Sequence, residues 1–158
     1  MLGQPWVPAI RRVISSGETK AIETATILAD HLAVEVEIRP GTGENDRTAT
    51  GYLPRDEFDE VADTFFAEPD RSVRGWERAE DAQARIVAQL ADLVAPEEGG
   101  RGDVAVVGHG AVGTLWLCHL SDLRIDRRHD QPGQGHYFTV DRTTGAVVHP
   151  WRPIDAIG

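Results

Sequence analysis

Apolar positions along this chain follow two periods, one typical of strands and one typical of helices. In residues 34–38, valine and isoleucine alternate with glutamate, which predicts a strand with one wet face. Residues 12–16 and 104–107 contain short apolar runs that predict buried strands. Residues 137–140 and 146–149 flank a polar turn, which predicts an antiparallel hairpin at the end of the chain.

Helical spacing of apolar residues predicts four helices. The first begins at a capping box formed by Ser15 and Glu18, and Pro54 opens the second. The third covers residues 76–94, and the last ends near Leu120. The residues predicted to face inward from the first three helices are Ile22, Ala25, Leu28, Ala29, Leu32, Phe58, Val61, Ala62, Phe65, Ala79, Ala82, Ile86, Leu90 and Leu93.

Predicted strands alternate with predicted helices along most of the chain, and polar loops are expected at residues 44–51 and 96–100. Such alternation is typical of α/β proteins, in which helices cover both faces of a parallel sheet. We therefore expect a three-layer α/β/α sandwich with a mostly parallel sheet and a C-terminal antiparallel hairpin. No internal repeat or linker divides the sequence, so residues 1–158 are expected to form a single domain.

The charge balance argues against binding to nucleic acid or to an anionic membrane. The formal net charge is -10, and no basic patch is visible in the sequence. The sequence shows no signal peptide and no apolar run long enough to span a bilayer. The single cysteine, Cys118, cannot form an internal disulfide and suggests a reducing compartment. We therefore expect a cytoplasmic protein and interpret Cys118 as a small core residue.

The segment around His109 carries the most specific chemical signal. The β-branched run of residues 104–107 ends at Gly108, His109 and Gly110, and an apolar helical pattern follows. A strand that turns into a helix presents free N–H groups and the positive end of the helix dipole to an anion. The glycines allow close approach of a ligand to the backbone. This turn therefore predicts a phosphate or carboxylate site beside an imidazole.

A second strand-to-helix turn, at Ser15 and Ser16, is expected beside the first. Ligands of parallel α/β sheets bind beyond the carboxyl ends of the strands, where both turns would lie. Lys20, the only lysine of the chain, follows about one helical turn later and could reach the same pocket. Ser16, Lys20 and His109 together predict a site for an oxyanion.

The glycines also permit a different interpretation. Gly108, Gly110 and Gly113 have the G-x-G-x-x-G spacing of dinucleotide-binding turns, and Asp126 lies near the expected acidic position. However, only residues 114–158 follow, and they end in a predicted hairpin rather than in further βαβ units. A two-half dinucleotide fold would not fit into this length.

Several motifs in order resemble the histidine phosphatase (phosphoglycerate mutase-like) superfamily between about residues 10 and 140. The segment Ser15-Ser16-Gly17-Glu18-Thr19-Lys20-Ala21-Ile22-Glu23-Thr24-Ala25 is similar to the family pattern Ser-x-x-x-Arg-Ala-x-x-Thr-Ala, with Lys20 at the place of the phosphate-binding arginine. Gly108-His109-Gly110 resembles the second His-Gly motif of the family. Glu44 resembles the loop glutamate that donates a proton. Glu77 and Arg85 are similar to the start of the family's Gly-Glu-Ser…Arg helix.

The resemblance implies a phosphoglycerate mutase-like fold and hydrolysis of a small phosphomonoester through a phosphohistidine. It implies that His109 stabilises the transferring phosphoryl group and that Glu44 protonates the leaving oxygen. Lys20, Ser16 and Gly110 would bind the phosphate, although lysine lacks the bidentate fork of arginine. We expect no metal and no cofactor. Specificity is expected to come from residues 55–70.

One family motif, an Arg-His-Gly tripeptide that carries the phosphorylated histidine, is absent from this sequence. We therefore expect an N-terminally incomplete domain with impaired or absent phosphatase activity. A non-catalytic phosphate-binding or scaffold protein is the alternative. The missing motif belongs to a central strand, so neighbouring strands would keep unpaired backbone groups. Either a further segment upstream of Met1 or association of chains, as in a homodimer, is expected to cover them.

Overall fold

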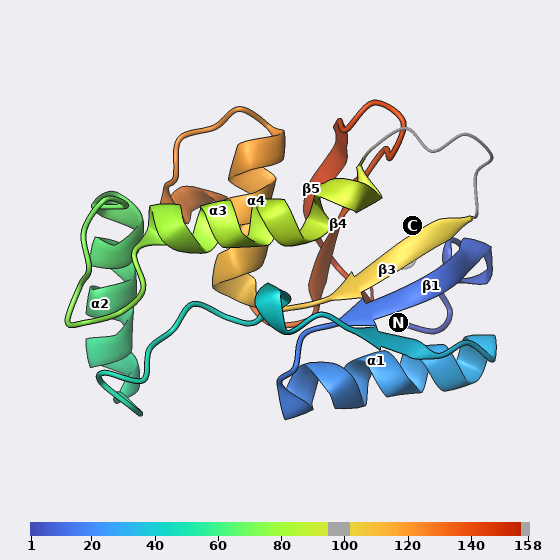
Figure 1. Cartoon of the computed structure of the whole chain (residues 1–158), viewed down its shortest axis with the longest axis horizontal. Coiled ribbons are helices and arrows are strands. Elements are labelled where there is room, and N and C mark those ends of the chain that lie inside the picture. The colour runs from blue at the N-terminus through green and yellow to red at the C-terminus, as the bar shows by residue number, and fades with distance from the viewer. Residues whose placement is uncertain (95–101, 156–158) are drawn as a thin grey trace.

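The computed structural model describes residues 1–94 and 102–155, and Figure 1 shows the arrangement of their helices and strands. The predicted loop at residues 96–100 lies outside the described residues. Short 3-10 helices cover Val7–Ala9, Pro40–Thr42, Ala91–Leu93 and Arg127–His129. The main elements in chain order are β1 (Ile10–Ser15), α1 (Thr19–Leu32), β2 (Val36–Ile38), α2 (Arg55–Ala67), α3 (Ala79–Leu90), β3 (Asp103–Val107), α4 (Gly110–Leu120), β4 (His136–Val140) and β5 (Val147–Pro153).

Strand β1 lies at the centre of a three-stranded parallel sheet with the order β2-β1-β3. The register places Ser15 opposite both Ile38 of β2 and Val107 of β3. The three strands therefore end at the same edge of the sheet. The segments that follow β1 and β3 therefore begin side by side at that edge, where the sequence analysis predicted the site.

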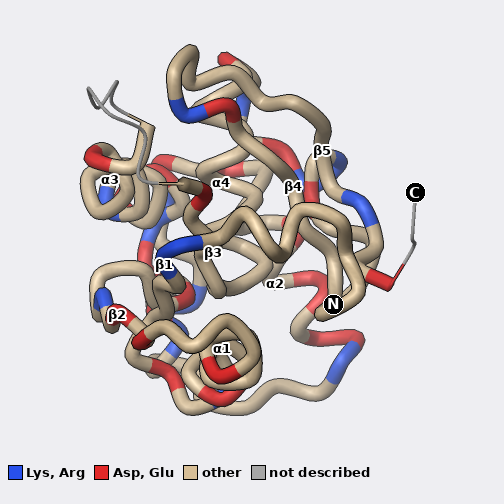
Figure 2. The backbone as a smooth tube through the Cα atoms, turned by 90° about the vertical axis from the view of Figure 1, so that its right-hand side faces the viewer, with Lys and Arg blue, Asp and Glu red and all other residues tan. Residues whose placement is uncertain are grey.

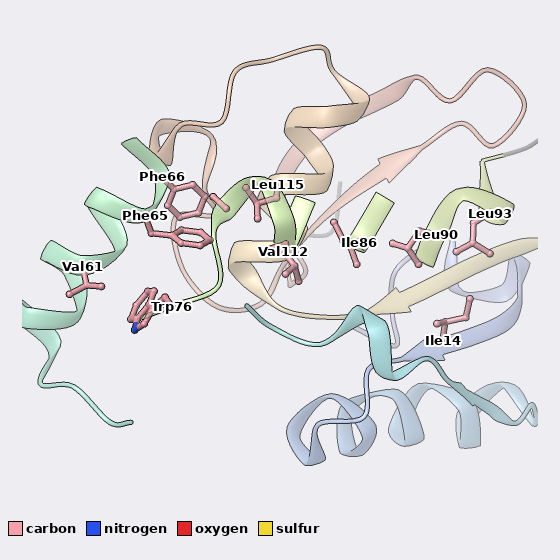
Figure 3. Close-up of a cluster of buried hydrophobic side chains, with 12 residues drawn as sticks. Ile14, Val61, Phe65, Phe66, Trp76, Ile86, Leu90, Leu93, Val112 and Leu115 are labelled. Carbon is pink, nitrogen blue, oxygen red and sulfur yellow. The ribbon is translucent and has the colours of Figure 1, made fainter. Parts of the chain in front are cut away.

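The alternation of side chains along β1 separates two hydrophobic clusters. Ile14 points into the larger cluster, which includes buried residues of α2, α3 and α4 and is drawn in Figure 3. Val13 points to the opposite face, where it packs with Ala25 and Leu28 of α1. In Figure 1, α1 lies below the sheet, and α3 and α4 lie above it. The predicted three-layer sandwich is confirmed.

The C-terminal hairpin is confirmed as a separate two-stranded antiparallel sheet of β4 and β5. Strand β5 continues to Pro153, four residues beyond the predicted end at His149. The hairpin packs against α4 through aromatic contacts: the ring centroids of Trp116 and Phe138 are 5.6 Å apart. In the described part of the chain, β3 pairs only with β1, so the two sheets are not joined by a backbone ladder.

The predicted capping box at Ser15 and Glu18 is wrong. Ser15 is the last residue of β1, and its hydroxyl donates a hydrogen bond to the carbonyl of Ser16. The first helix starts later, at Thr19, with Glu18 as a cap residue of extended backbone and without a side-chain capping bond. Strand β1 includes Ser15, the predicted cap residue. The Glu18 side chain is therefore free of a capping bond and can make other contacts.

The third helix is shorter than predicted at both ends. Regular α-helix begins at Ala79 instead of residue 76, and the last turn, Ala91–Leu93, is 3-10. Trp76 is nevertheless buried, because its ring packs edge-on against Phe65 of α2 at 6.1 Å. Its indole N–H donates to the Thr50 hydroxyl at 2.9 Å. Trp76 is therefore buried by contacts with other segments of the chain, although it lies outside the helix that was predicted to begin there.

Charged groups are spread along the backbone in Figure 2, where acidic and basic segments are interspersed in the view shown. Arg127 is one example, because its guanidinium bonds Asp59 and Asp63 of α2 at 2.7 and 2.5 Å. These ion pairs tie α2 to the segment that follows α4. None of the described helices combines the length and the apolar character that a membrane crossing needs.

Candidate functional site

His109 is the N-cap residue of α4 and lies directly beyond the end of β3. It is 9% exposed. Because Ser15 and Val107 are paired in the sheet, the residues that follow them are neighbours, and the Ser16 hydroxyl lies 2.7 Å from His109 Nε2. The structure thus brings together Ser16 and His109, as the two strand-to-helix turns predicted.

Glu18 enters this site as a third group, which sequence reasoning did not identify. Its Oε1 lies 3.1 Å from His109 Nε2 and accepts a hydrogen bond of 2.8 Å from the Glu44 N–H. Its Oε2 lies 3.4 Å from Lys20 Nζ. The available signal was an acidic residue at the strand-to-helix turn, and it was assigned to a capping box that does not form.

The serine, histidine and glutamate do not form a hydrolytic triad. In such a triad the serine contacts one imidazole nitrogen and the carboxylate orients the ring through the other nitrogen. Here Ser16 Oγ and Glu18 Oε1 both contact Nε2 of His109. The Ser16 hydroxyl also accepts from the Glu18 N–H at 3.3 Å. The geometry therefore fits a shared binding centre and does not activate Ser16 as a nucleophile.

Glu44 reaches the site from the loop after β2. Its carboxylate accepts hydrogen bonds from the N–H groups of Val112 and Ala111, at 3.2 and 3.4 Å. These are N–H groups of the first turn of α4, which a helix cannot satisfy internally. Glu44 therefore caps α4 from a distant segment, and its negative charge lies at the positive end of the helix.

Lys20 and Gly110 lie at the edge of this centre. The Lys20 side chain is 64% exposed and contacts Glu18 as its one ion-pair partner among the described residues. Gly110 is the first residue of α4, and a Cβ added there would lie 2.6 Å from Gln131 Nε2. The end of the Gln131 side chain therefore lies against position 110, and phosphate binding by Gly110 stays a prediction.

Arg85 of α3 fixes the loop that carries Glu44. Its guanidinium donates to the carbonyls of Gly41, Gly43 and Glu44, at 2.7, 3.0 and 3.3 Å. The same side chain bonds both carboxylate oxygens of Glu77 at 3.0 and 2.8 Å. Glu77 in turn accepts from the Asp46 N–H at 3.1 Å. Glu77 and Arg85 therefore position the loop and lie behind the site.

An open depression adjoins the site. It is lined by Glu18, Glu44, Asn45, Asp46, Arg47, Thr48 and Gly51. The Arg47 guanidinium lies over the rings of Phe58 and Trp76, 5.2 and 5.6 Å from their centroids. Asn45 is 4% exposed, and its Nδ2 has no hydrogen-bond partner among the described residues. The lining comes from residues 18 and 44–51, and none of it from residues 55–70, to which the sequence assigned specificity.

Burial and neighbouring charges shift the pKa values of His109 and Glu18 at this centre. Burial lowers the pKa of His109, while the carboxylates of Glu44 and Glu18 oppose this shift, and Lys20 and Arg47 add to it. Glu18 shows the reverse balance. Its partial burial raises its pKa, but the Glu44 N–H bond and the charges of His109 and Lys20 outweigh burial, so the pKa of Glu18 is lowered.

Comparison with known proteins identifies the family. The profile of the histidine phosphatase superfamily (branch 1) matches residues 7–146. This chain belongs to that superfamily. The resemblance found in the sequence motifs is thereby confirmed, and the matched region contains Ser16, Glu18, Lys20, Glu44 and His109.

Solved structures agree with this histidine phosphatase fold. A mycobacterial glucosyl-3-phosphoglycerate phosphatase is 19% identical and superimposes with a TM-score of 0.69, covering 90% of this chain and 75% of its own. YhfR of Bacillus stearothermophilus is 21% identical with a TM-score of 0.67, covering 89% and 72%. The mycobacterial enzyme has also been solved with inorganic phosphate and with VO3. No curated protein matches the chain.

The fold of this histidine phosphatase family member argues against the dinucleotide interpretation of the glycine turn. Beyond α4 the described chain continues into an antiparallel hairpin, so no further βαβ unit follows the turn. Gly113 is close to Trp151 of β5, and a Cβ at this position would lie 3.0 Å from that ring. The third glycine therefore serves packing of the hairpin on α4.

Other candidate ligands and nucleophiles lie apart from the site. Within residues 1–94 and 102–155, no three His, Cys, Asp or Glu side chains are placed to hold a metal ion. Cys118 is buried in α4, and burial raises the pKa of its thiol. A thiol of raised pKa and no exposure is a poor nucleophile, which is consistent with its interpretation as a core residue.

Proposed function

We propose that this chain is a phosphatase-like protein that binds the phosphate group of a small phosphomonoester at His109. One observation carries the proposal: His109 Nε2, the Glu44 N–H and Lys20 Nζ converge on a single carboxylate, that of Glu18. The carboxylate thus marks a position suited to an oxyanion. The mycobacterial structure with inorganic phosphate supports this ligand class for the fold.

Each residue then has a role that follows from its position. A protonated His109 donates a hydrogen bond to a phosphoryl oxygen, and Lys20 supplies a mobile positive charge at the rim. Ser16 orients the imidazole through its 2.7 Å contact. Glu44 lies at the start of α4 and, when protonated, could donate to a leaving oxygen.

We propose that this 158-residue sequence binds phosphomonoesters but hydrolyses them weakly or not at all. Phosphoryl transfer in the expected mechanism needs a second imidazole as acceptor. Among the described residues, His109 is the one histidine whose contacts reach Ser16, Glu18 or Lys20. A non-catalytic phosphate-binding or scaffold protein is the second candidate, and it is favoured by the negatively charged Glu18 in the binding position.

We further propose that the ligand is a small molecule and that the protein works in the cytoplasm. The net charge of -10 disfavours polyanions such as nucleic acids. Three of the groups that line the depression are carboxylates, those of Glu18, Glu44 and Asp46, whereas Arg47 is the one cation. A ligand with its phosphate at His109 and Lys20 would have its remaining polar groups near Arg47, the one cation of this lining.

The proposal is tested by binding and turnover together. Inorganic phosphate or tungstate should raise the melting temperature, because a ligand that binds only the native state stabilises it. His109→Ala and Lys20→Ala should each remove most of the shift. His119→Ala is the control, since His119 is exposed at the other end of the same helix. An unchanged melting temperature at high ligand concentration contradicts the proposed function.

Turnover distinguishes the two candidates. Hydrolysis of p-nitrophenyl phosphate should be absent or very slow, and no acid-labile phosphate should be trapped on the protein. A rate that His109→Ala abolishes, together with trapped phosphohistidine, would show that this sequence is a working phosphatase. Slow turnover that His109→Ala abolishes would support an impaired phosphatase, whereas phosphate binding with no detectable turnover would support the non-catalytic protein.

A further inference from the structure

Glu18 occupies the position where the donors of the site converge. Its Oε1 is shared between His109 Nε2 at 3.1 Å and the Glu44 N–H at 2.8 Å, while Oε2 faces Lys20 Nζ at 3.4 Å. The Glu44 N–H thus donates to this carboxylate, and His109 Nε2 and Lys20 Nζ lie within ion-pair distance of it. A phosphate group bound to the same donors would place its oxygens where the Glu18 oxygens lie.

Capping of α1 does not account for this placement. Glu18 is the N-cap residue of α1, yet its side chain makes no capping bond to that helix. An acidic residue at a helix start normally lies against the helix's own free N–H groups. The Glu18 carboxylate instead turns away to His109. Its side chain is 41% exposed, so a rotation toward solvent could clear the position without unfolding the turn.

We propose that Glu18 is a specificity-determining residue of this pocket, an internal carboxylate ligand that an incoming phosphate group must displace. The inference rests on the proposed phosphate-binding function and adds a restriction to it. Carboxylate and dianion compete for the same donors, and each repels the other if both remain. The apparent affinity for a dianion is the intrinsic affinity multiplied by the fraction of molecules in which Glu18 has left the pocket. Ligands that bind strongly must therefore bring contacts beyond the phosphate, at the depression lined by Asn45 and Arg47.

The test compares Glu18→Gln with Glu23→Gln by titration calorimetry with inorganic phosphate. Gln keeps an oxygen acceptor for the Glu44 N–H but removes the charge. Glu23 is exposed on α1, so its variant removes the same charge outside the pocket. We expect Glu18→Gln to bind phosphate at least about fivefold more tightly than wild type, from loss of one like charge at close range. Glu23→Gln should match wild type.

The His109 imidazole gives a second readout that needs no ligand. The carboxylates of Glu18 and Glu44 raise its pKa, while burial, Lys20 and Arg47 lower it. In an NMR titration of the free protein, Glu18→Gln should therefore lower the pKa of His109, and Glu23→Gln should leave it unchanged. Glu18→Ala repeats both measurements without any side-chain oxygen at this position.

The outcomes separate the inference from the function on which it rests. If wild type and Glu18→Gln bind phosphate equally, or if the variant binds more weakly, Glu18 is no competitor and the inference is wrong while the function stands. If neither protein binds phosphate, the proposed function fails and the inference fails with it. Tighter binding by Glu18→Gln, with a lowered pKa of His109, supports both.

Discussion

Arg85 holds both carboxylate oxygens of Glu77, through Nε at 3.0 Å and Nη2 at 2.8 Å. Glu77 precedes α3 and Arg85 lies within it, eight positions later, and both also bind the loop of residues 41–46 through its N–H and carbonyl groups. The pair therefore links the helical layer above the sheet to the loop that delivers Glu44. Its contribution is structural, because it contacts backbone and not the open side of the pocket.

Replacing Arg85 should destabilise the protein and loosen the Glu44 loop. Arg85→Lys removes the planar guanidinium, which donates hydrogen bonds to Glu77 and to backbone carbonyls of residues 41–44 at the same time. Loss of charge-assisted hydrogen bonds at a partly buried site should lower the free energy of unfolding by about 1–3 kcal/mol. Urea unfolding measures this change. Arg71→Lys is the control, because Arg71 pairs with Glu68 on the surface, where exposed pairs contribute about 0–1 kcal/mol. Equal losses in the two variants would contradict the role of Arg85.

The layers of the fold could be predicted because they depend on local side-chain period. Val13 and Ile14 face opposite clusters as adjacent strand residues must, and Leu28, Phe65 and Ile86 are buried as helical spacing predicted. The pocket of Ser16 and His109 also follows from sequence, because both residues come directly after parallel strands. The family match to residues 7–146 confirms the resemblance to the histidine phosphatase superfamily.

Features that depend on contacts between distant segments could not be read from the pattern. Glu18 matched a local capping motif, and only the packing of the Glu44 loop and His109 around it shows its other partners. Trp76 matched helical spacing, although it is buried by Phe65 before the helix begins. Glu44 was interpreted as a proton donor. Its hydrogen bonds to the start of α4 join segments that are far apart in the chain, and the spacing of residues in the sequence does not predict such a contact.

Glu44 should contribute to stability through these hydrogen bonds. Glu44→Ala removes the acceptor for the Val112 and Ala111 N–H groups, so the first turn of α4 loses its cap. The expected loss in unfolding free energy is about 0.5–2 kcal/mol, the usual range for a lost cap. Glu44→Gln retains an oxygen and should lose less. If the two variants unfold alike and like wild type in chemical denaturation, the contact does not stabilise the helix.

Oxyanion affinity should fall as the pH rises from about 6 to about 8. Burial lowers the pKa of His109 in the free protein, whereas a bound dianion favours the imidazolium form and raises it. Binding then takes up a proton, and affinity decreases by up to about tenfold for each pH unit between the two pKa values. Sulfate is the appropriate probe because it stays a dianion across this range. His109→Gln should flatten the profile in titration calorimetry. A flat profile in wild type would mean that His109 does not contact the anion.

Strand β3 should take part in association of chains. In the described residues it pairs with β1 on one side only, and β4 and β5 pair with each other in a separate sheet. The segment from Val104 to Val107 is apolar yet only partly buried, unlike the fully buried Val13 and Ile14 of β1. Parallel strands with apolar residues are normally covered on both sides, and an uncovered apolar edge promotes pairing with another chain.

We therefore expect a homodimer or larger assembly whose population rises with protein concentration. Light scattering coupled to gel filtration should show a mass above that of one chain, decreasing on dilution. Hydrogen exchange supplies an internal control within the same sheet. The amides of β3 should exchange more slowly as concentration rises, because association covers their free edge, while those of β1 already lie between two strands and should not change. A monodisperse monomer, with β3 protection independent of concentration, would contradict association through this edge.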